Sequence, residues 1–415
     1  MAVLLLTAAP GALAAQTGAA PRPHEPTSYS ITLVTSDTGG HVLGEVETGW
    51  RLRTVEPVEL KLDSALRVIR VLVDGKPNTR LSRTMYARQG SEVVVPHEKA
   101  PGDTLTTRVR YHGTAASGLR VGADRTGARA LAGETAAGRA RFWLPVPAGD
   151  AGRVTVTWNV QASEGQRAVA NGTLVKVDTL SYGHTTWHFS ADAPIPLDAL
   201  AAAVGRYAVT TLPHPGCTSR CVPVTLWTAP DDSAAAAAGP FRRAGEMADY
   251  LSGLVGPFPY AALAHVASPL PPAGRAGASV VLYDETRVHA GSVDEREIAR
   301  ATAAQWFGNA VDEAGPAAGR PAEAVAAYLA VLWARQAAGV AGGKRPATEA
   351  LTREVAAVQR LHQTVGDSAF FRGLRRYVEA NRNATAEPGA FERAMSEAAE
   401  KPLDWSFERA VGQAR

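Results

Sequence analysis

Cysteine is scarce in this sequence, because the 415 residues include only Cys217 and Cys221. A metal site built on this pair would need two further ligands, and the only candidate close by in the sequence is His214. An excess of basic residues is also missing, since 43 Lys and Arg stand against 40 Asp and Glu and are spread along the chain. We therefore expect neither a cysteine-rich metal site nor a nucleic-acid-binding surface.

The apolar run at the N-terminus, residues 1–15, is too short for a membrane-spanning helix. It ends in Ala12-Leu13-Ala14, the small-x-small pattern of a signal-peptidase site, although a positively charged start is absent. We predict a signal peptide over 1–15 and a secreted or extracytoplasmic protein with no transmembrane segment. The alternative is a frayed apolar terminus. In an oxidising compartment, Cys217 and Cys221 are expected to form a local disulfide.

A chain of this length exceeds a single ordinary core, so more than one domain is expected. Residues 16–27 are rich in proline and polar residues, which predicts a linker. From Tyr29 to about Val209, alternating β-branched runs recur between turn residues, which is typical of an antiparallel β-sandwich. The remainder is rich in alanine and predicted to be mainly helical. One helix is expected to be capped by Asp231-Asp232-Ser233 and to end near Val255.

The stretch Ile298–Tyr328 has the spacing of a metallopeptidase site. In such a site two His one helical turn apart bind zinc, a Glu between them activates water, and a Glu on the next helix is the third ligand. In one large group of such peptidases, the first helix continues from its second His directly into Gln-Trp-Phe-Gly-Asn. The same run, Gln305-Trp306-Phe307-Gly308-Asn309, is present here and fixes the positions that correspond to the site. It assigns Arg300 and Ala304 to the two His positions and Ala301 to the base position. Glu323, which follows Ala304 after eighteen intervening residues, occupies the third-ligand position.

These residues resemble the M1 family of zinc aminopeptidases, the gluzincins related to aminopeptidase N. Short sequence motifs in the β-rich region, such as Arg141-Phe142-Trp143-Leu144-Pro145, occur in the same order as in the N-terminal domain of this family. The resemblance implies an α+β, multidomain protein. We expect a saddle-like, antiparallel β-sandwich domain over 28–209, and then a mainly helical, thermolysin-like peptidase domain over 210–415.

Further family positions are degenerate. The Gly-x-Met-Glu-Asn strand, whose Glu binds a substrate amino group, corresponds to Gly277-Ala278 and the residues after it, without Met, Glu or Asn. The oxyanion-stabilising Tyr corresponds to Leu351. Glu134 lies near a second amine-binding position, with a solvated loop acid as the alternative. Glu134, Gly277, Ala278 and Tyr328 are therefore the candidates for the substrate cleft.

The sequence predicts an exported pseudopeptidase with a binding or structural role. No cofactor is expected, and the proposed ligand is a peptide or protein in the vestigial cleft. The alternative is an active zinc aminopeptidase with a non-standard ligand set, although removing one member of a concerted catalytic set usually abolishes most activity. A hydrolase with a new nucleophile, such as Ser279 or Thr302, is disfavoured because neither has a His nearby in the sequence.

Arg300 is predicted to replace the metal. Burial of an unpaired Glu323 carboxylate would cost several kcal/mol, and a guanidinium matches a carboxylate in shape and charge. We expect a salt bridge between Arg300 and Glu323 in a buried site. The alternative is that Arg300 extends to solvent and Glu323 is hydrated in an open cleft.

Overall fold

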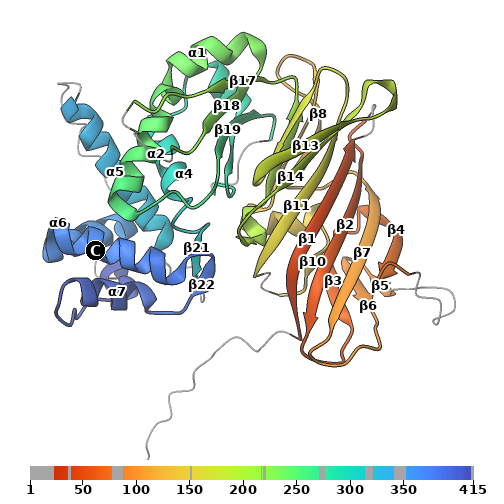
Figure 1. Cartoon of the computed structure of the whole chain (residues 1–415), viewed down its shortest axis with the longest axis horizontal. Helices are drawn as coiled ribbons and strands as arrows, with labels where there is room; N and C mark the ends of the chain where they lie inside the picture. The colour runs from red at the N-terminus through yellow and green to blue at the C-terminus, as the bar shows by residue number, and fades with distance from the viewer. Residues whose placement is uncertain are drawn as a thin grey trace, which may run out of the picture.

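The computed structural model describes residues 23–35, 39–76, 87–149, 152–215, 217, 221–270, 276–313, 321–340 and 352–412. A β-rich N-terminal half and a C-terminal half that carries the helices lie side by side (Figure 1). The predicted α+β, multidomain class is confirmed. The signal-peptide prediction over 1–15 and the oxyanion position Leu351 lie outside the described residues.

The largest sheet has the strand order β13-β14-β11-β1-β2-β7-β4, with β15 pairing to β11. Two four-stranded sheets, β10-β3-β6-β5 and β12-β16-β9-β8, complete the N-terminal half. The strands of this half are β1 His24–Thr35, β2 Val42–Leu52, β3 Val58–Lys61, β4 Leu66–Val73, β5 Ala87–Gln89, β6 Glu92–Val95, β7 Thr104–Gly113, β8 Leu119–Ala123, β9 Arg129–Glu134, β10 Val146–Pro147, β11 Arg153–Ala162, β12 Arg167–Ala170, β13 Thr173–Thr179, β14 Thr185–Ser190, β15 Ile195–Pro196 and β16 Ala201–Gly205.

Two details of this half differ from the prediction. Strand β1 begins at His24, so the last residues of the expected linker 16–27 already pair with β2. The pairing of β1 with β11 is parallel, so the sheet is mixed rather than purely antiparallel. Alternating burial along β2 and β11 places one face of each strand in the core, which is the pattern that the sequence indicates.

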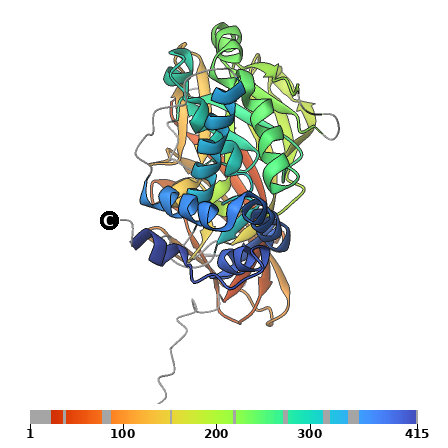
Figure 2. The same cartoon turned by 90° about the vertical axis from the view of Figure 1, so that its left-hand side faces the viewer.

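The C-terminal half contains a third four-stranded sheet, β17-β18-β19-β20, and a small pair of strands, β21 and β22. Since β17 belongs to this sheet, the chain passes between the halves at Arg206-Tyr207, just before the boundary expected at Val209. The elements are β17 Ala208–Thr211, β18 Val224–Thr228, α1 Ser233–Ala238, α2 Ala244–Val255, β19 Leu263–Ser268, β20 Val280–Asp284, α3 Glu285–His289, α4 Glu295–Ala303, β21 Val311–Glu313, α5 Ala322–Val340, α6 Arg353–Asn381, β22 Ala384–Ala386, α7 Ala390–Ala398 and α8 Phe407–Gly412. Figure 2 shows helices α5 and α6 on the outer side of this half.

The single helix expected up to Val255 is two helices. Gly239 and Pro240 separate α1 from α2, because proline lacks the N–H that a continuing helix needs. Asp232 does not cap α1 with its side chain. The predicted disulfide between Cys217 and Cys221 is present and precedes β18.

Apolar packing joins the two halves. Each half has its own core, and a third cluster contains side chains from both. This shared core is defined by Ala132, Val169, Ala201 and Ala203 from the first half and Ala264, Val266, Leu270, Val280 and Leu282 from the second. None of the described helices is both long enough and apolar enough to cross a membrane.

Candidate functional site

Helices α4 and α5 carry the residues whose spacing indicated a metal site. The Asp294 side chain accepts a hydrogen bond from Arg296 N and so caps the start of α4, while Ile298, Ala299, Thr302 and Ala303 bury one face of the helix. Arg300 lies in the last turn of α4, and Glu323 lies in the first turn of α5. The two helices pack against each other.

The structure brings Arg300 and Glu323 into direct contact. Arg300 Nη2 donates a hydrogen bond to Glu323 Oε1. The pair is not buried, however, since 42% of the Arg300 side chain and 78% of the Glu323 side chain are exposed. The expectation of a buried carboxylate is therefore wrong, because the first turn of α5 leaves Glu323 on its solvent side while Ala324, Val325 and Ala326 face the core.

The side chains at the expected ligand positions do not fit a zinc ion. Arg300 is a permanent cation, Ala304 has no donor atom, and Glu323 is the single carboxylate, already engaged by a guanidinium. Within the described residues, no group of three His, Cys, Asp or Glu side chains is close enough to hold a metal ion.

Glu134 ends β9 and is buried, with 5% of its side chain exposed. Arg139 Nη1 donates to Glu134 Oε1 at 2.8 Å. The carboxylate is therefore neither a solvated loop acid nor an unpaired anion available to a substrate amine. Arg139 follows five residues later in the sequence, where a short-range search for a counterion could have found it.

The segment Gly277–Ser279 is held on both sides by side-chain amides. Gln305 Oε1 accepts from Ser279 N at 2.8 Å, and Gln305 Nε2 donates to Gly277 O at 3.1 Å. On the other side, Asn171 Nδ2 donates to Ala278 O at 2.5 Å. Since Ala278 N donates to Ala199 O and Ser279 O accepts from Ala264 N, few backbone groups remain for pairing with a bound peptide.

The same segment packs closely against the first half of the chain. A side chain at Gly277 would place its Cβ 2.9 Å from the Ala201 Cβ, and Ala201 pairs with Glu134 across β16 and β9. Gln305 also donates to Ala301 O at 3.1 Å, which joins α4 to this segment. The structure thus gathers Glu134, Gly277, Ala278 and Ala301 in one region. The hydrogen bonds of Asn171 and Gln305 to this segment could not be predicted from the neighbouring sequence, because the bonded residues are far apart in the chain.

Tyr328 lies elsewhere. Its side chain is buried between α5 and α6, and its hydroxyl is 2.9 Å from His362 Nδ1, while His362 Nε2 is 2.9 Å from Asp367 Oδ1. The ring packs edge-on against Phe370. Burial lowers the pKa of His362. Tyr328 therefore joins two helices, which differs from its expected place in a substrate cleft.

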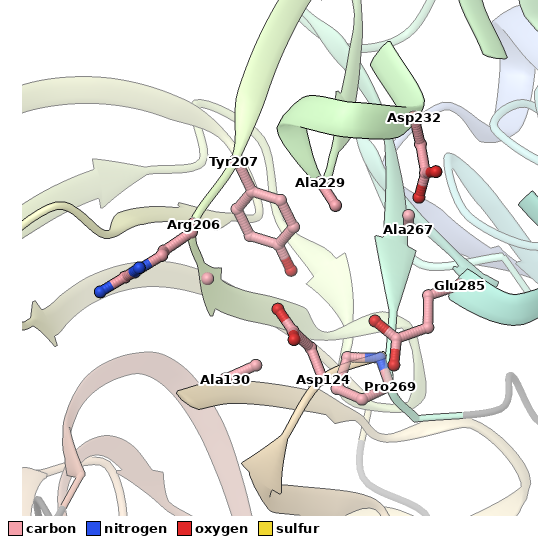
Figure 3. Close-up of a pocket in the computed structure, with 10 residues that line it drawn as sticks. Asp124, Ala130, Arg206, Tyr207, Ala229, Asp232, Ala267, Pro269 and Glu285 are labelled. Carbon is pink, nitrogen blue, oxygen red and sulfur yellow. The ribbon is translucent and has the colours of Figure 1, made fainter. Parts of the chain in front are cut away.

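A small pocket of about 10 Å³ lies at the junction of the two halves, and none of its lining residues is among those predicted to form the site (Figure 3). Arg125 of the first half donates to Asp232 of the second at 2.9 Å, and His289 Nδ1 lies 2.7 Å from the same carboxylate. Glu285 lines the pocket, and burial raises the pKa of its carboxyl group. The volume of the pocket suits about one water molecule. The Arg125–Asp232 hydrogen bond joins the two halves beside it.

No protein-family model matches the sequence, and no curated protein does. Solved structures do match over almost the whole chain. The M1 zinc metallopeptidase from Deinococcus radiodurans is 21% identical, with 95% of this chain and 93% of that chain covered and a TM-score of 0.71. A mutant of that peptidase bound to a Tyr-Ser-Ala substrate is 22% identical, with 94% of both chains covered and a TM-score of 0.74.

This chain has the fold of the M1 zinc metallopeptidases. A two-domain mutant bound to L-tryptophan gives the same picture, with 22% identity, 95% and 94% coverage and a TM-score of 0.73. At this identity the likeness establishes the M1 fold alone. Three features of this chain bear on its function: the Arg300–Glu323 pair, the Glu134–Arg139 pair and the segment Gly277–Ser279 held by Gln305 and Asn171.

Proposed function

We propose that this protein is an exported, catalytically inactive relative of the M1 peptidases that keeps the fold for a binding or structural role. The observation that carries the proposal is the Arg300–Glu323 contact. In this contact the Arg300 guanidinium occupies the one carboxylate expected to bind zinc. A single carboxylate in a site that needs three ligands would in any case bind zinc weakly.

Two further features support the loss of aminopeptidase chemistry. A substrate amine needs an unpaired carboxylate, but Glu134 already has Arg139 as its partner at 2.8 Å. A general base at the position of Ala301 is absent, because alanine cannot take up a proton. These are separate changes, each of which would impair the same reaction.

The ligand class that the fold favours is a peptide or a protein, because M1 structures have been solved with a Tyr-Ser-Ala substrate and with L-tryptophan. The competing proposal, an active zinc aminopeptidase with other ligands, is favoured by the M1 fold itself. A direct measurement separates the two proposals.

The test is the zinc content and the aminoacyl-anilide hydrolysis of the purified chain. We expect far less than one zinc per chain and no chelator-sensitive hydrolysis. Stoichiometric zinc together with hydrolysis that a chelator abolishes would overturn the proposal and favour the active enzyme.

A reconstructed variant tests the register on which the proposal rests. Arg300→His, Ala301→Glu and Ala304→His together place two imidazoles one turn apart beside Glu323, and this triple variant should bind about one zinc. The matched control carries the same three changes with Glu323→Ala, and we expect at least about tenfold weaker zinc binding. Equal zinc binding by both variants would show that Glu323 is not at the third-ligand position.

A further inference from the structure

Strand β13 is an exposed apolar edge. It ends the largest sheet, and among the described strands it pairs with β14 alone. Large hydrophobic side chains gather on β13 and the turn after it, where five of the seven exposed ones among the described residues lie: Leu174 47%, Val175 64%, Val177 41%, Leu180 43% and Tyr182 96%. Edge strands with this composition readily pair with another chain, so natural sheets usually protect them.

The backbone of β13 presents hydrogen-bonding groups outward at its centre. Leu180 N donates to His184 O, so the N–H of Leu180, directly after β13, points toward the partner strand. In an antiparallel ladder, hydrogen-bonded and non-hydrogen-bonded pairs alternate. The register continues without a shift from Thr179 to Lys176, and the N–H and C=O groups of Val177 and Thr179 therefore point away from β14.

The charges on β13 are arranged so that the strand is complementary to itself. Lys176 and Asp178 lie on one face, with Lys176 Nζ 2.7 Å from Asp178 Oδ2. If two copies pair antiparallel about a two-fold axis at Val177, each Lys176 lies opposite Asp178 of the other copy. Val177 then faces Val177, within the part of β13 that has a regular register. Opposite charges and apolar pairs directly across strands are the contacts that stabilise a sheet.

We propose that β13 forms an isologous contact with β13 of a second copy of this chain, which joins the two largest sheets into one continuous sheet. The outward groups of Val177 supply the hydrogen-bonded pair on the axis, and each Lys176 exchanges its partner within the strand for Asp178 of the other copy. The contact is two-fold symmetric, as most homodimers are. One strand pair buries less surface than stable dimers need, so the dimer is expected to be weak and concentration-dependent.

The first test measures the mass of the purified chain by sedimentation over about 1 to 200 µM, a range that covers weak complexes. The wild-type chain should shift from monomer to dimer within it. Val177→Pro removes the outward N–H and no bond of the β13–β14 ladder, so it should weaken association by at least about tenfold while the fold is retained. Val177→Thr keeps the N–H and the branched side chain and serves as the matched control.

The second test distinguishes pairing with a second copy from pairing with any other strand. Asp178→Lys and Lys176→Asp each place like charges across the two-fold axis, and each should weaken self-association. The two variants mixed, or both changes in one chain, restore opposite charges and should restore association. A wild-type chain that stays monomeric at about 200 µM, or a Val177→Pro variant that dimerises as well as the Thr control, would overturn the proposal, as would failure of the charge exchange.

Discussion

Arg300 and Glu323 meet across α4 and α5, and their exposure determines what the contact contributes to stability. Exposed ion pairs gain little, since water screens the charges and both side chains lose freedom. The pair is better understood as an obstacle to a cation at this position than as a source of stability. This differs from the buried salt bridge that the sequence led us to expect.

A double-mutant cycle of Arg300→Ala and Glu323→Ala should therefore give a coupling free energy of about 0.2–1 kcal/mol in urea unfolding. The coupling should decrease when the salt concentration is raised to about 1 M, because surface charges are screened. A coupling above about 3 kcal/mol, as in buried pairs, would contradict the exposed geometry.

His265 on β19 is the residue for which pH should matter most. It is fully buried against Tyr283, whose hydroxyl lies 2.9 Å from His265 Nδ1, and burial lowers the pKa of the imidazole to about 3. The folded state thus takes up this proton at a lower pH than the unfolded state, in which an ordinary His has a pKa of about 6.5. Its contribution to stability is complete above pH 6.5 and is lost as the pH falls toward 3.

Relative to His265→Gln, the wild-type chain should therefore lose up to about 1.4 kcal/mol of unfolding free energy for each pH unit between 6.5 and about 3. Urea titrations at several pH values measure this difference. The control is His112→Gln on β7, where the side chain is exposed in the folded state. A wild-type and His265→Gln difference that stays constant with pH would show that His265 does not titrate in this way.

At the scale of elements, α4 is tied to the segment Gly277–Ser279 by one side chain. Gln305 is fully buried, accepts from Ser279 N and donates to Gly277 O. Replacing it by a residue of similar size without polar atoms leaves both backbone groups buried and unpaired. Each such loss costs about 1–3 kcal/mol.

Gln305→Leu should lower the free energy of unfolding by about 2–4 kcal/mol, as measured by urea titration. Thr302→Val on the same helix is the matched control, because the buried Thr302 hydroxyl donates only to Ile298 O, which the helix ladder also satisfies. We expect that change to cost less than about 1 kcal/mol. Similar losses for the two variants would mean that Gln305 is replaceable packing rather than a clamp.

Some features of the helices and their contacts were predictable from the sequence, and others were not. The run Gln305–Asn309 predicted the Arg300–Glu323 contact, since its spacing belongs to two helices that pack together. Exposure was not predictable, because it depends on which residues of α5 face the core. The break between α1 and α2 was predictable, because Gly239-Pro240 is a local helix-breaking pair. The contacts of Arg125 and His289 with Asp232 were not, because these residues lie 107 and 57 positions from Asp232 in the sequence.

At the scale of the whole molecule, the two halves are expected to unfold together. Large chains usually unfold domain by domain, and polar interfaces between domains favour that behaviour. Here the shared core is apolar and buried, and Asn171, Gly172 and Arg125 add hydrogen bonds across the junction to Ala278, Ser279 and Asp232. Separation of the halves would expose this core to water.

Hydrogen exchange followed by mass spectrometry at increasing urea concentration tests this coupling. Peptides from β1 and β11 and peptides from α4 and α5 should lose protection at the same urea concentration in the wild-type chain. Ala203→Asp puts a charge into the shared core, where Ala203 is fully buried, and should separate the two transitions. Val175→Asp, on the exposed edge strand β13, should leave them coincident. Separate transitions in the wild-type chain would show that each half is stable by itself, and the shared core would then be a contact between two independent domains.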